Sequence, residues 1–197
     1  TGCRTTKGVT GYDLTRLLVG SEGTLALITE ATLKLLPAPE AVATLRLCFA
    51  DNRSALDAVS RVMHQSVMPC ALEFMDHRAI DAIRPTGAAD DLPSGTRALL
   101  MVEADGAAQD VPRQIAALEQ ALAGDGLIEM KSGFQRDEIV QLWTARKSLS
   151  HAVKQIAPLK LNEDVVVPVS QLAVAGPASG NPSRRSSDKP AVRRPRR

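Results

Sequence analysis

Residues 11–40 of this 197-residue chain read GYDLTRLLVGSEGTLALITEATLKLLPAPE. Within them, Gly20 and Gly23 bracket a short polar turn, and an apolar-rich run over 24–37 follows at once. A glycine adopts positive φ freely and has no Cβ, so a ligand can approach the neighbouring backbone N–H groups directly. An ordinary β-turn before a strand accounts for the same spacing equally well. A dinucleotide-binding fingerprint is excluded, because the glycine spacing differs and a strand rather than a helix is expected after the turn.

The sequence around this turn predicts a short first domain. Asp13 is placed to cap a helical turn over 13–18, and 24–37 reads as two strand-like pieces. Pro37 and Pro39 then interrupt the chain and mark a domain boundary.

Beyond that boundary, hydrophobic periodicity alternates between strand and helix. This pattern predicts an α+β sandwich, an antiparallel sheet with helices on one face. The strands are expected over 42–50, 70–75, 97–106, 127–133 and 161–168, and the helices over 52–65, 76–83, 110–124 and 134–156.

Composition narrows the class of protein. Apolar residues make up 44 % of the chain and charged residues 23 %, which indicates a mostly globular protein. The three cysteines include no CxxC pair and the three histidines have no metal-ligand spacing, so no metal site is predicted. No apolar run approaches the roughly 20 residues that span a bilayer, and no signal peptide is apparent. We therefore expect no transmembrane segment and a cytoplasmic location.

The basic residues are concentrated at one end of the chain. Residues 173–197 hold seven of the 24 lysines and arginines and one of the 22 acidic residues, so this tail carries +6. The 172 residues before it carry 17 basic and 21 acidic side chains, a net charge of −4, which gives no support for nucleic-acid binding there. The tail is rich in Pro, Ser and Arg, and we expect it to be disordered. A solvated end is favoured over binding to nucleic acid or an anionic membrane.

Arg146 is the candidate binding residue that the residues themselves single out. At about 100° per residue, it falls within the apolar face of the helix expected over 134–156. A guanidinium in such a place needs an anionic partner, because an unpaired buried charge is costly. That partner is a substrate carboxylate in one interpretation. In the other, Arg146 forms an internal ion pair with Glu73 or Asp164, or extends its charged end to solvent.

The segment GYDLTRLLVGSEGTLALITEATLKLLPAP resembles the end of the FAD-binding domain (type 4, PCMH-like) of the vanillyl-alcohol-oxidase-like flavoproteins. The nearest branch holds D-lactate dehydrogenases, the FAD subunit of glycolate oxidase, D-2-hydroxyglutarate dehydrogenase and alkyl-dihydroxyacetonephosphate synthase. ALEFMD and LNEDVVVP resemble the substrate domain of the same family, so the resemblance covers roughly residues 1–172.

The resemblance implies a division into domains. Residues 1–39 would be the C-terminal part of an FAD-binding domain, 40–172 a partial ferredoxin-like substrate domain with an antiparallel sheet, and 173–197 the disordered tail. FAD would lie along a segment in which Ala26 replaces the usual glycine of the family. The residues of this segment are Glu22, Gly23, Thr24, Leu25, Ala26, Leu27 and Ile28.

The resemblance also implies a function, the FAD-dependent oxidation of a small D-2-hydroxy acid such as D-lactate, glycolate or D-2-hydroxyglutarate. The α-hydride would pass to the flavin and then to an unidentified electron acceptor. Arg146 would bind the substrate carboxylate, with Lys160 as a weaker candidate. The pyrophosphate-binding loop of the family and its HxGxGxxH-like segment are missing, so the chain is expected to be truncated at both ends and the catalytic base is unknown. Two alternatives stay open: a non-catalytic α+β interaction module without FAD, and an alkyl-dihydroxyacetonephosphate synthase-like flavin transferase.

Overall fold

A computed structural model describes residues 1–5, 7–156, 159 and 168 of the chain. The contacts divide the chain into two units, Thr1–Ala38 and a second that begins at Pro39. The tail, Lys160 and all of the strand expected over 161–168 except Pro168 lie outside the described residues.

The first unit contains one short helix, α1 (Leu14–Leu18). The side chain of Asp13 accepts a hydrogen bond from the backbone N–H of Arg16 at 3.1 Å, which confirms the predicted cap. The prediction of strands over 24–37 was wrong, because this part of the described chain has no regular secondary structure. A strand needs a partner for its backbone groups, and no described strand pairs with this segment. Its apolar side chains are accordingly exposed, Leu27 by 88 % and Leu35 by 85 %.

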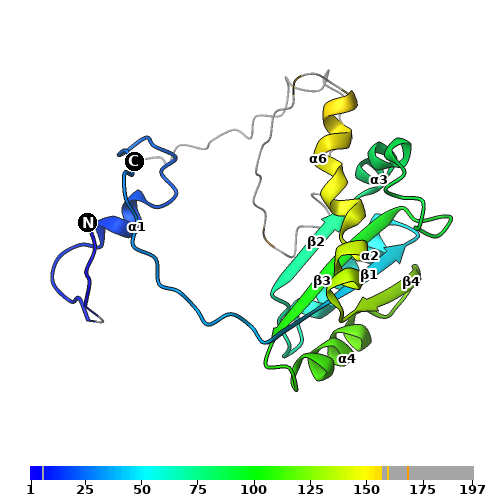
Figure 1. Ribbon diagram of the computed structural model, residues 1–197, viewed down its shortest axis with the longest axis horizontal. Coiled ribbons are helices and arrows are strands. Elements are labelled where there is room, and N and C mark those ends of the chain that lie inside the picture. Colours follow the sequence, from blue (N-terminus) through cyan, green and yellow to red (C-terminus); the bar gives the residue numbers. More distant parts are fainter. Residues whose placement is uncertain (6, 157–158, 160–167, 169–197) are drawn as a thin grey trace, which may run out of the picture. The chain divides into compact units, whose positions relative to one another are not determined.

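The second unit is built on a four-stranded antiparallel sheet (Figure 1). Its order is β2-β3-β1-β4, so the two longest strands lie in the middle. This confirms the α+β class and four of the five strands expected after the boundary. The strands are β1 (Ala41–Phe49), β2 (Ala71–Met75), β3 (Ala98–Gly106) and β4 (Leu127–Gly133).

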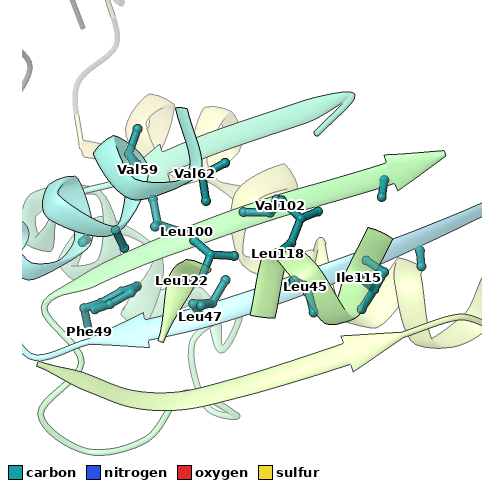
Figure 2. Close-up of a cluster of buried hydrophobic side chains, with 14 of the residues drawn as sticks. Leu45, Leu47, Phe49, Val59, Val62, Leu100, Val102, Ile115, Leu118 and Leu122 are labelled. Carbon is teal, nitrogen blue, oxygen red and sulfur yellow. The ribbon is translucent and has the colours of Figure 1, made fainter. Parts of the chain in front are cut away.

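Helices cover both faces of this sheet, and the expectation of helices on one face was wrong. On the first face, α2 (Asn52–Met63) and α4 (Val111–Leu122) enclose a core with the inward side chains of β1 and β3 (Figure 2). The second face packs against α3 (His77–Ile83), α5 (Arg136–Leu142) and α6 (Thr144–Ile156). The reason is that the second row of the central strands also carries apolar side chains, among them Cys48, Leu99 and Met101, and these need cover. A short 3₁₀ helix, η1 (Arg84–Thr86), continues α3.

The single helix expected over 134–156 is in fact two helices, α5 and α6, separated by Trp143. The side chain of Glu138 accepts hydrogen bonds from the backbone of Phe134 and Gln135, which fixes the start of α5. At the other end, Trp143 has φ −78° and ψ −7°, away from ideal helical values. Leu142 packs against the backbone of Gly133 in β4. The helix therefore breaks at Leu142 and Trp143, two consecutive residues whose side chains contact the sheet.

Gly126, in the turn between α4 and β4, is required by both conformation and space. Its φ is +73°, and a Cβ built there would lie 2.3 Å from the Oγ of Ser54 at the start of α2. The carbonyl of Gly126 also accepts a hydrogen bond from the backbone N–H of Ala50 at 2.8 Å. The turn thus joins the end of β1 and the start of α2 to the entry of β4.

We expect Gly126→Ala to lower the free energy of unfolding by about 2–5 kcal/mol. A left-handed conformation costs a residue with a Cβ about 1–2 kcal/mol, and overpacking adds about 1–3 kcal/mol. Gly95→Ala is the matched control, because Gly95 has φ +84° but its nearest contact would be Ile128 Cδ1 at 3.9 Å. Urea denaturation should show a clearly smaller loss for Gly95→Ala; equal losses would contradict the steric argument.

Candidate functional site

The candidate site lies on the second face of the sheet, where the strand register gathers polar side chains. Thr44 of β1 pairs with Glu103 of β3, and Arg46 pairs with Met101. Met101 pairs on its other side with Glu73 of β2. Because cross-strand partners point to the same face, these residues share the face that packs against α6.

Glu103 connects the sheet to the break between α5 and α6. Its Oε1 accepts hydrogen bonds from Thr44 Oγ1 at 2.8 Å and from the indole Nε1 of Trp143 at 2.7 Å. Thr44 is fully buried, and Glu103 and Trp143 are partly buried. Bonds to a charged acceptor are stronger than neutral ones, so this contact holds the only tryptophan of the chain firmly against β3.

Arg146, one turn after Trp143, forms an ion pair with Glu73. Its Nε lies 3.0 Å from Glu73 Oε2, and the side chains are 37 % and 42 % exposed. The structure therefore shows the internal ion pair with Glu73 that the second interpretation of Arg146 expected. The pair with Glu73 uses only Nε, and the terminal nitrogens Nη1 and Nη2 of Arg146 make no hydrogen bond to another described residue.

The helix break modifies the predicted apolar face around Arg146. Leu142 is buried at the end of α5, while Trp143 and Leu149 pack against the core of the second face. Val153 is only partly buried, and Ala145 and Ala152 take the fully covered positions of α6. Arg146 thus lies at the margin of the apolar contact rather than inside it.

Sequence reasoning missed Arg46, a buried arginine on the same face. Its side chain is 1 % exposed and contacts Asp91, and its Nη2 lies 3.3 Å from Glu129 Oε1. Lys131 Nζ in turn lies 2.9 Å from Glu129 Oε2. A signal was present, since Arg46 stands between Leu45 and Leu47 in an apolar strand. With helices expected on one face only, alternation along the strand gave no reason to expect a buried partner for this side chain.

The segment expected to contact FAD belongs to the first unit. A hydrogen bond of 2.9 Å from Thr24 N to Ser21 O closes a turn, so the β-turn interpretation is seen here. Glu22 has φ +49° and Gly23 has φ +78°, and a Cβ on Gly23 would meet nothing within 4 Å. The backbone at Gly23 is therefore open to a ligand, which fits a cofactor held through close backbone contact. The apolar side chains of Leu25, Leu27 and Ile28 are exposed by 59 %, 88 % and 62 %.

Three other potentially reactive groups of the described chain have a structural partner or an unfavourable pKa. His64 bonds to the carbonyl of Ser60, and His151 to the side chain of Gln155. Partial burial, with the Asp105 and Glu103 carboxylates, raises the pKa of the Cys70 thiol to about 11, so it stays protonated at neutral pH. The described residues include no group of three or more His, Cys, Asp or Glu side chains that could hold a metal ion.

Two further properties of the described residues have no link to these sites. None of their helices combines the length and apolar character needed to cross a bilayer. A surface hollow of about 320 Å³ lies on the other helix layer and contains no predicted site residue. It is lined by Val67, Asp110, Arg113, Gln114 and Ala117.

The fold and the polar cluster define an α+β domain with an arginine-centred site on one face of an antiparallel sheet. Residues 38–175 match the family described as FAD linked oxidases, C-terminal domain, and the chain belongs to this family. FAD is the cofactor that the family description names, in agreement with the cofactor expected from the segment around Gly23.

Two curated relatives confirm the branch of the family. Over 173 residues the chain is 35 % identical to the glycolate oxidase subunit GlcD of Bacillus subtilis (strain 168), covering 88 % of this chain and 37 % of the relative. It is 30 % identical to the probable mitochondrial D-lactate dehydrogenase of Danio rerio, covering 87 % of this chain and 34 % of that protein. The chain thus spans about a third of the length of these relatives.

A solved structure shares the fold. An alkyldihydroxyacetonephosphate synthase structure superposes with a TM-score of 0.54 at 18 % identity, covering 74 % of this chain and 29 % of that one. Identity this low shows the fold alone.

We expect Trp143→Phe to lower the free energy of unfolding by about 1.5–3 kcal/mol, the usual contribution of a hydrogen bond to a charged group. An aromatic ring remains, smaller than the indole, but the N–H whose hydrogen bond Glu103 accepts is lost. Urea denaturation measures the effect, and a double-mutant cycle with Glu103→Ala isolates the contact. A loss of the same size in the Glu103→Ala background would show that the hydrogen bond is not its origin.

Proposed function

We propose that this chain is part of an FAD-dependent oxidoreductase that oxidises a small D-2-hydroxy acid of the D-lactate, glycolate or D-2-hydroxyglutarate class at its CH–OH group. Membership of the FAD-linked oxidase family and the names of the two curated relatives support the class of reaction. The observation that carries the proposal for this chain is Arg146, whose Nε is held by Glu73 while its terminal nitrogens bind no described residue.

In this proposal each unit has a separate task. Residues 1–39 form the end of the FAD-binding domain, and the backbone of 22–28 lies along the cofactor. Residues 40–172 form part of the substrate domain, where Arg146 binds the substrate carboxylate through its fork of N–H donors. When bound, FAD supplies the acceptor for the hydride of the α-carbon. Lys160, as a second carboxylate-binding cation, stays a prediction outside the described residues.

The catalytic base is not assigned to a residue of this chain, and the electron acceptor is unidentified. The cytoplasmic location remains a prediction.

Two alternative functions are separated by simple observations. A non-catalytic interaction module would purify without flavin even when FAD is added, whereas the favoured function predicts yellow protein. The flavin-transferase alternative rests on a fold shared at 18 % identity, which carries no information on chemistry. Reduction of bound flavin by D-lactate or glycolate would argue against it.

We expect Arg146→Met to weaken binding of D-lactate by roughly 2–5 kcal/mol, or about 30-fold to a few thousand-fold. Its stability should change by less than about 1 kcal/mol, because the pair with Glu73 is more than one-third exposed. Arg146→Lys should recover only part of the affinity, since an ammonium cannot make a two-pronged contact. Fluorescence titration of Trp143 measures affinity and urea unfolding measures stability. The opposite pattern, lost stability with unchanged affinity, would show that the ion pair is purely structural.

We expect Gly23→Val to abolish retention of FAD, because it places a branched side chain where the backbone must approach the cofactor. Gly11→Val is the matched control, since Gly11 has φ +85° and equally open surroundings but lies outside the FAD segment. Ala26→Gly should keep or tighten binding. The measurement is flavin absorbance per chain after gel filtration with added FAD. Equal flavin content in the two valine variants would refute the assignment.

A further inference from the structure

The start of α6 is tied to the sheet at two points on neighbouring strands. Trp143 Nε1 donates to Glu103 of β3 at 2.7 Å, and Arg146 Nε donates to Glu73 of β2 at 3.0 Å. Trp143 and Arg146 are three residues apart, which places them on the same side of a helical turn. Glu73 and Glu103 belong to adjacent strands, two register positions apart on the same face. One turn of helix therefore spans two sheet carboxylates.

The two contacts leave Arg146 little freedom. The contact between Trp143 and Glu103 fixes the backbone at the beginning of α6, since Glu103 is also held by the buried hydroxyl of Thr44. An arginine side chain still has several rotatable bonds, and ordering them on binding costs free energy. Glu73 restricts this remaining motion, because its carboxylate accepts the hydrogen bond that Nε of the guanidinium donates.

We propose that Glu73 is a positioning residue, which orients the guanidinium of Arg146 so that its terminal Nη1 and Nη2 groups receive the carboxylate of the substrate. This inference rests on the proposed function and deepens it. Arg146 touches the substrate, whereas Glu73 acts through Arg146. A planar guanidinium has five N–H donors, so Nε can bind one carboxylate while the terminal edge binds another.

Two other roles for Glu73 make different predictions. If Glu73 occupied the place that the substrate carboxylate needs, removing it would tighten binding. If the ion pair only stabilised the fold, removing it would shift unfolding and leave affinity unchanged. Both side chains are more than one-third exposed, so the contribution of the pair to stability is expected to be small.

The experiment compares Glu73→Ala and Glu73→Gln with wild type in the full chain. The probe ligand is D-lactate, and D-lactamide, which lacks the negative charge, is the ligand control. Trp143 is the only tryptophan, so its single indole ¹H–¹⁵N signal and its fluorescence both report on this turn of helix. Asp81→Ala is the matched control variant, because Asp81 is an exposed carboxylate 3.3 Å from the Nε of Arg84, outside the site.

We expect Glu73→Ala to weaken D-lactate binding by about 10- to 100-fold, the scale of a lost positioning contact. Glu73→Gln should show a smaller loss, because its amide oxygen still accepts from Arg146 Nε. Asp81→Ala should bind like wild type, D-lactamide should be insensitive to all these variants, and urea midpoints should change no more than in Asp81→Ala.

Other results overturn the inference. Tighter binding in both Glu73 variants would identify Glu73 as a competitor of the substrate carboxylate, and a shifted midpoint with unchanged affinity would identify a structural contact. If wild type and Arg146→Met respond identically to D-lactate, the assignment of Arg146 fails, and the role of Glu73 fails with it. That result differs from a failure of Glu73 alone, in which Arg146→Met loses affinity and Glu73→Ala does not.

Discussion

The arrangement of this domain depends on the burial of both faces of its two central strands. β1 and β3 carry apolar side chains on the face covered by α2 and α4 and on the face covered by α3, α5 and α6. Removing the apolar surface of each row from water stabilises the fold by roughly 25 cal/mol per Å². Thr44 and Arg46 on the second face are enclosed with them, and buried polar groups need partners there. The contacts of Thr44 with Glu103 and of Arg46 with Asp91 and Glu129 follow from this enclosure.

Much of the fold could be predicted from the sequence because periodicity reports local structure. Four strands of the second unit, the helix cap at Asp13 and the position of Arg146 on a helix all came from patterns within a few residues. The packing of helices on both faces of the sheet could not be predicted in this way, because the sequence of a strand such as β1 shows only that its side chains alternate between two faces. Whether its polar row faces water or a second helix layer depends on segments 40 or more residues away, as the contact between Arg46 and Asp91 illustrates.

The errors at the candidate site have the same origin. Helical periodicity predicts one continuous helix over 134–156. The indole of Trp143, however, donates a hydrogen bond to Glu103 on a distant strand, and the helix breaks there. The register that places Glu73 and Glu103 on one face is likewise a long-range property. For the FAD segment, the structure shows a turn with a left-handed φ at Gly23, and the contact with the cofactor stays a prediction. The strands predicted over 24–37 are absent from the structure, because a strand needs a second strand to pair with and a local sequence pattern does not show whether one is present.

Burial divides the arginines of the second face between two tasks. Arg46 is 1 % exposed and contacts Asp91 and Glu129, and removing a partner from such a buried pair typically costs about 3–5 kcal/mol. Arg146 is 37 % exposed, and its contact with Glu73 involves only Nε, so exchanging solvent at the other end of its guanidinium is inexpensive. A residue that binds a ligand reversibly must be able to release it. Among the described residues, only Glu73 forms a hydrogen bond with the side chain of the less buried arginine, so the proposed reversible binding is consistent with Arg146 and not with the buried Arg46.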